Sequence, residues 1–83
     1  MTGYDGQLTQ CYRGSQGGRP GWWLRFAPNA AVQRGLEAYI PAGERLLRRA
    51  HGQPEWWVAA GHEPTLLRLF PGFTAYLAQQ QLL

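Results

Sequence analysis

The stretch WWLRF at residues 22–26 decides the fold, because it is rich in side chains that favour β-strands and ends just before a proline. A second stretch of this kind, EWWVA at residues 55–59, follows a Gly-Gln-Pro turn sequence. Both predict strands. Because neighbouring side chains in a strand point to opposite faces, each tryptophan pair must be divided between the two faces of a sheet. We expect Trp22 and Trp56 to enter the core and their neighbours to lie on the other face.

Helical patterns lie between and after these strands. Asn29 is a suitable N-cap for a helix over residues 30–40, where apolar side chains recur every three or four positions, and Pro41 ends that helix. Pro64 occupies a favourable first position for a second, short helix that ends before Pro71. The sequence therefore predicts helices that alternate with the aromatic strands.

Three other segments have patterns that are compatible with more than one secondary structure. Residues 41–52 combine adjacent leucines with flanking charges, so local propensity favours a short helix, whereas their position before an aromatic strand favours one arm of a hairpin. The tail at residues 73–83 is compatible with a strand or a helix, and we favour the helix. Residues 1–21 hold six of the 11 glycines and predict a flexible N-terminal arm that can include a short edge strand. Residues 22–83 are then the domain proper.

Length and composition limit the class of protein. The chain has 83 residues, all eight of its basic residues are arginines, and its formal charge is +3. A chain of this length forms one small domain whose stability is marginal without a partner. No apolar stretch approaches the ~18 residues of a membrane-spanning helix, and the first residues lack the pattern of a signal peptide. We therefore expect a soluble, cytoplasmic protein with no membrane partner.

Patterns typical of catalysis or metal binding are missing from the sequence. The five acidic residues show no paired spacing, and no glycine-rich phosphate-binding loop follows a predicted strand. Cys11, His51 and His62 fall short of the four ligands of a structural zinc site. We expect a protein that is not an enzyme and that carries no cofactor or metal.

The order of elements resembles the small HARP-type domains found beside annealing helicases and the related damage-recognition-like domains of repair helicases. Their pattern runs F-x-x-N, an apolar helix, I-P-x-x-x-R, a turn, W-x-V and L-x-x-L-F. The residues that carry the match are Phe26, Asn29, Val32, Leu36, Ile40, Pro41, Arg45, Trp57 or Trp56 with Val58, Leu66, Leu67, Leu69 and Phe70. The chain departs from the pattern at residues 48–54, where Arg-Arg-Ala-His-Gly-Gln-Pro stands in place of a Trp-Asp-Pro hairpin.

This resemblance implies an α+β domain with a β-α-β-β-α core over residues 22–73, in which a small antiparallel sheet carries two helices on one face. It also implies that residues 44–50 form a strand paired with residues 55–59. Such domains are linked to binding DNA at forks or single-strand junctions.

A sheet face left open by the helices would combine aromatic rings, on which bases stack, with arginines, which neutralise phosphates. The first functional hypothesis is therefore a nucleic-acid-binding module for single-stranded or junction DNA. Its predicted site residues are Trp23, Arg25, Arg45, Arg48, Arg49 and Trp57. The second hypothesis is a protein-interaction or homodimerising module that uses the same aromatic face. The chain's own N-terminal arm or C-terminal tail is a further candidate to cover that face.

Overall fold

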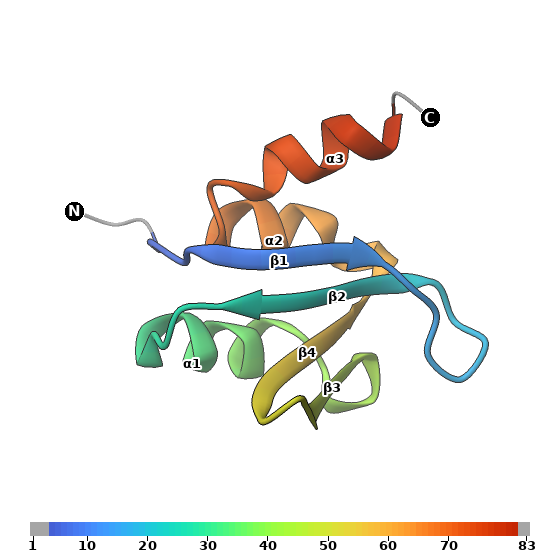
Figure 1. The fold of residues 1–83 in the computed structure, drawn as a ribbon, viewed down its shortest axis with the longest axis horizontal. Helices are drawn as coiled ribbons and strands as arrows, with labels where there is room; N and C mark the ends of the chain where they lie inside the picture. Colours follow the sequence, from blue (N-terminus) through green and yellow to red (C-terminus); the bar gives the residue numbers. More distant parts are fainter. Residues whose placement is uncertain (1–3, 82–83) are drawn as a thin grey trace.

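Four antiparallel strands form one sheet in the order β1-β2-β4-β3, and helices cover one of its faces (Figure 1). The computed structural model describes residues 4–81. The strands are β1 (Leu8–Arg13), β2 (Gly21–Phe26), β3 (Arg45–Ala50) and β4 (Gln53–Ala59). The helices are α1 (Ala30–Tyr39), α2 (Glu63–Leu69) and α3 (Phe73–Gln81), with short 3-10 turns η1 (Ala42–Glu44) and η2 (Ala60–His62). The predicted α+β class, with an antiparallel sheet and helices on one face, is confirmed.

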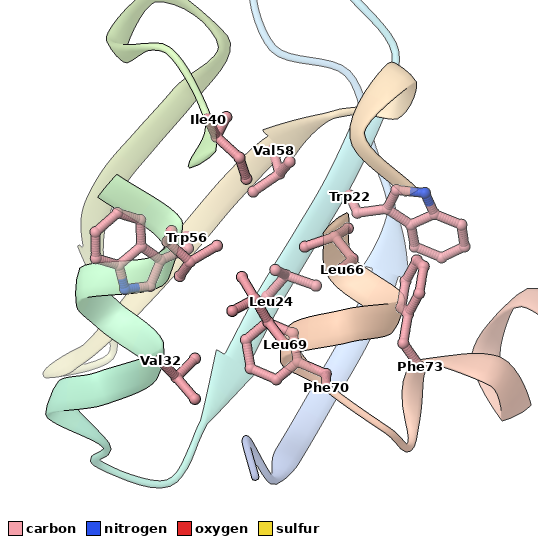
Figure 2. Close-up of a cluster of buried hydrophobic side chains, with 11 residues drawn as sticks. Trp22, Leu24, Val32, Ile40, Trp56, Val58, Leu66, Leu69, Phe70 and Phe73 are labelled. Atoms are coloured by element: carbon pink, nitrogen blue, oxygen red, sulfur yellow. The ribbon is translucent and has the colours of Figure 1, made fainter. Parts of the chain in front are cut away.

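The main core lies between the sheet and the helices. Trp22 and Leu24 from β2 and Trp56 and Val58 from β4 meet apolar side chains of α1, α2 and the first residue of α3 (Figure 2). The helical side chains in this cluster are Val32, Leu36, Leu66, Leu69 and Phe73. Trp22 and Trp56 therefore occupy the face that the alternation of side chains predicts for them.

Helix α1 begins where the sequence places it. The Asn29 side-chain oxygen accepts a hydrogen bond of 3.1 Å from the backbone N–H of Val32, which satisfies one of the free donors of the first turn. The helix ends at Tyr39, two residues before Pro41, whose ring cannot continue it.

Residues 45–50, for which local propensity favours a helix and the family resemblance implies a strand, form strand β3. The strand pairs with β4 over its whole length, from Arg45 opposite Val58 to Ala50 opposite Gln53. The two-residue loop between them, His51-Gly52, has φ values of 55° and 76°, as a tight hairpin of this kind requires. Cross-strand pairing thus outweighs a weak local helical preference.

Both ends of the described chain add elements to the predicted β-α-β-β-α arrangement. Part of the expected N-terminal arm forms β1, which pairs with β2 along an antiparallel register with one irregularity between Leu8 and Gln10. The tail forms α3, as favoured from the sequence, and lies beside β1 (Figure 1). Of the predicted tail, Leu82 and Leu83 lie outside the described residues. Among residues 4–81, no helix combines the length and apolar character needed to cross a membrane.

Gly21 is a position where the fold admits no side chain. A Cβ there would lie 2.5 Å from the carbonyl oxygen of Val58 and would also meet the indole ring of Trp57. We predict that Gly21→Ala lowers the free energy of unfolding by about 1–3 kcal/mol, because backbone and ring must move apart. Urea denaturation followed by circular dichroism measures this. Gly61→Ala is the matched control, since a Cβ at Gly61 meets nothing within 4 Å; equal stabilities of the two variants would contradict the prediction.

Candidate functional site

The second face of the sheet carries the other member of each tryptophan pair. Trp23 of β2 lies directly opposite Trp57 of β4, and both join Ala59 in a buried cluster separate from the main core. The predicted face is therefore correct. The expected exposure is wrong, because only 4% of Trp23 and 3% of Trp57 is accessible to solvent.

The loop between β1 and β2 covers part of this face. The indole N–H of Trp57 donates a hydrogen bond of 3.0 Å to the carbonyl oxygen of Gly14. Gly14 also lies so close to Trp23 that a Cβ would be 2.6 Å from that ring. Further along the loop, Arg19 donates to the carbonyl oxygen of Gly43 at 3.1 Å, which joins the loop to η1. A segment of the expected N-terminal arm thus covers the rings.

Arg48 covers the ring of Trp23. Its guanidinium carbon lies 3.8 Å from the ring centroid, a cation–π contact that reaches from β3 across β4 to β2. Trp23 and Arg48 were predicted as neighbours in one site, and the structure does bring them together. They contact each other, however, so the face of Trp23 that a base would need is occupied by the guanidinium.

A buried carboxylate holds Arg48 in this position. Glu55 is 1% exposed, and its Oε1 accepts a hydrogen bond from Arg48 Nε at 2.9 Å. Its Oε2 accepts one from the hydroxyl of Tyr12 at 3.0 Å, and Arg25 Nε lies 3.6 Å from the same oxygen. Sequence reasoning missed this role of Glu55. The alternation of β4 was a usable signal, because it places Glu55 on the same face as Trp57.

The surroundings of Glu55 favour its charged form. Burial alone raises the pKa of the carboxyl, but hydrogen bonds from Arg48 and Tyr12 and the charges of Arg48 and Arg25 outweigh it, so its pKa lies below the usual 4.5. The pKa of the Tyr12 hydroxyl is raised, first by burial and then by its hydrogen bond to the carboxylate. At neutral pH the pair is therefore a carboxylate and a protonated phenol.

The remaining predicted arginines lie on the other side of β3. Arg45 and Arg49 pair with Val58 and Pro54, so their side chains alternate with that of Arg48. Arg45 donates to the carbonyl oxygen of Ile40 at 2.9 Å, next to the end of α1. The structure thus brings together four of the six predicted site residues, whereas Arg45 and Arg49 lie apart from them. The four are Trp23, Arg25, Arg48 and Trp57.

Strand β3 is an outer strand of the sheet, paired on one side with β4. An outer strand presents a row of backbone N–H and C=O groups that no neighbouring strand uses. Two large apolar side chains on it are open to solvent, Leu46 with 38% and Leu47 with 52% of their surface accessible. This edge therefore combines free backbone groups, apolar side chains and three arginines.

The described residues form no group of metal ligands, and Cys11 is partly buried. Within residues 4–81, no three His, Cys, Asp or Glu side chains lie together as metal ligands. Burial raises the pKa of the Cys11 thiol to about 12, so the thiolate needed for nucleophilic attack is scarce at neutral pH.

Comparison with family models, with curated proteins and with solved structures gives no match for this chain. The resemblance to HARP-type domains remains a prediction from the sequence.

Removing the Glu55 charge should destabilise the fold and change its response to acid. We predict that Glu55→Gln lowers the free energy of unfolding by about 1–3 kcal/mol at neutral pH, because two guanidinium groups lose their anion. The folded-state pKa lies below 4.5, so the stabilisation is fully present above that pH and is lost as the pH falls through the lower value. Urea denaturation at several pH values measures both effects.

The exposed Glu37 of α1 provides the matched control, Glu37→Gln, which changes the net charge equally. We expect this control to keep nearly the wild-type stability and its acid dependence. Equal losses in both variants would mean that net charge, rather than the buried contacts of Glu55, sets the stability.

Proposed function

We propose that this domain is a non-enzymatic protein-interaction module whose edge strand β3 pairs with an extended, acidic segment of a partner protein. The observation that carries the proposal is the combination of an outer strand with exposed leucines and three arginines over Arg45–Ala50. A partner segment would lie beside β3 as a fifth strand. Backbone hydrogen bonds would supply affinity, and side chains would supply specificity.

Strand β3 is a better platform than β1, the other edge of the sheet. The register of β3 with β4 runs without interruption over six residue pairs. The register of β1 with β2 shifts between Leu8 and Gln10, and such irregularities interrupt further pairing. The C-terminal helix α3 also lies beside β1 (Figure 1). A new strand therefore finds a regular backbone only at β3.

The side chains of β3 favour an acidic partner. Arg48 is paired with Glu55, so Arg45 and Arg49 supply the positive charge of the strand, which attracts carboxylates and speeds association. Self-pairing of two copies through β3 would bring the arginines of one strand near those of the other, and like charges across strands are destabilising. An acidic segment of a different protein thus fits this edge better than a second copy does.

Nucleic-acid binding is the second candidate function, and the clustering of arginines supports it. Arg19 is hydrogen-bonded to Gly43, next to β3, and adds a fourth guanidinium near the three of the strand. Such a cluster suits phosphates. Base stacking on Trp23 or Trp57, as expected from the sequence, would require the covering loop and Arg48 to move away. The exposed leucines have no role in phosphate binding, so we rank this candidate second.

We also propose a cytoplasmic location, which a chain with one free cysteine and no disulfide fits.

A titration with an acidic peptide tests the edge-strand proposal. An acetylated peptide of about ten alternating glutamate and valine residues is added to the isotope-labelled protein at low and moderate salt. We expect the largest backbone amide shifts at residues 45–50 and weaker binding as salt rises. Arg49→Glu should weaken binding about tenfold, because it reverses one charge on the strand. Arg34→Glu, the same change on the exposed surface of α1, should weaken it less than about twofold.

Two results would contradict the proposal. One is a titration in which the β3 amides do not shift, and the other is an equal loss of affinity in the Arg34→Glu and Arg49→Glu proteins. A thymidine oligonucleotide of about ten residues is titrated in parallel. Saturable, salt-sensitive binding of the oligonucleotide, with no effect of the peptide, would replace the first candidate by the second.

A further inference from the structure

A cavity of about 680 Å³ lies where strands β2 and β4 separate. These strands pair from Gly21 opposite Ala59 as far as Leu24 opposite Trp56. Beyond that point β4 continues toward its hairpin with β3, while β2 turns toward α1 (Figure 1). The start of α1 and the first half of β1 also contribute to the cavity wall. Its size lies in the range of small-molecule binding sites.

The lining combines apolar walls with hydrogen-bonding groups and one charge. Phe26, Leu47 and Trp56 supply apolar surface, and Gln33 and Gln53 supply amides. The charged side chain in the lining is Arg25, and no acidic side chain of the described chain lines the cavity. Sites of this composition bind an apolar body and orient it through a few polar contacts.

The charge of Arg25 is poorly compensated within the protein. Its Nη2 lies 3.4 Å from the carbonyl oxygen of Ala50, its Nε lies 3.6 Å from Glu55 Oε2, and the buried Nε makes no hydrogen bond. Glu55 has closer donors in Arg48, at 2.8 and 2.9 Å, and in Tyr12, at 3.0 Å. Two guanidinium groups therefore share one carboxylate, and the weaker contacts fall to Arg25.

The Arg25 side chain is 23% accessible to solvent, and its guanidinium group makes no short hydrogen bond. Such a group favours an anionic acceptor. A carboxylate matches the planar fork of its N–H groups. The N-terminal end of α1 lines the cavity, and its helix dipole adds to the attraction for negative charge. The apolar walls would take the rest of such a ligand.

We propose that this cavity binds an apolar group that carries a carboxylate, and that Arg25 holds the carboxylate. The ligand is a free aromatic or aliphatic acid, or the carboxyl terminus of a peptide, since both present this chemistry. The proposal does not depend on strand pairing at β3.

A matched pair of probes tests the proposal. The labelled protein is titrated with 4-phenylbutanoate and with its neutral analogue 4-phenylbutanamide, and the indole N–H signal of Trp56 and the Nε–H signal of Arg25 are followed. We expect both signals to shift with the acid, and the acid to bind at least about tenfold more tightly than the amide. Arg25→Gln should reduce the affinity for the acid to that for the amide. Arg34→Gln, which removes the same charge outside the cavity, should leave it unchanged.

A second variant keeps the test valid if Arg25→Gln disturbs the neighbouring Glu55. Ala30 lines the cavity from an exposed position on α1, so Ala30→Phe places a ring in the space and leaves Arg25 and its partners Ala50 and Glu55 unsubstituted. It should abolish binding of the acid in a protein that remains folded. Equal binding of acid and amide, or no shift of either signal at about 10 mM ligand, would overturn the proposal.

The two sources of the ligand are separated by a peptide with a C-terminal phenylalanine, compared with its amidated form. Stronger binding of the free-acid peptide than of 4-phenylbutanoate would assign the site to a peptide terminus. The reverse order would assign it to a small carboxylic acid, and Arg25 holds the carboxylate in both cases.

Discussion

The carboxylate of Glu55 is the contact on which the second face of the sheet depends. It is buried on β4, yet it accepts hydrogen bonds from Tyr12 of β1 and Arg48 of β3 and lies near Arg25 of β2. A single side chain therefore joins all strands of the sheet. A buried charge is unfavourable unless it is paired and hydrogen-bonded. Here one of the partners, Arg48, also covers part of the second face of the sheet. Once Arg48 is held by Glu55, its guanidinium lies over Trp23.

This arrangement changes where a partner can bind. A small domain buries a limited fraction of its surface, and this one gains a second apolar cluster by covering its own sheet with a loop and an arginine. The tryptophans that suggested a stacking surface thus stabilise the fold. The two proposals above therefore use other surfaces, the outer backbone of β3 and the cavity beside Arg25. Leu47 contributes to both, so the two surfaces adjoin.

Local patterns predicted the parts of the fold that depend on local rules. Side-chain alternation assigned Trp22 and Trp57 to the correct faces, and Asn29 was identified as the cap of α1. Residues 45–50 could not be assigned by propensity, because their pairing with β4 decides them. The burial of Trp23 could not be predicted from the sequence, because it depends on two contacts between distant parts of the chain. One is with Arg48, which reaches across a strand, and the other is with a glycine-rich loop.

Hydrogen exchange of the Trp57 indole N–H tests the central claim that the second face is closed by the chain itself. This group is buried and donates to Gly14 of the covering loop. We predict exchange at least about a hundredfold slower than that of a free indole, because the loop must open first. Exchange at the rate of a free indole in the folded protein would show that the face is open, and would contradict the account.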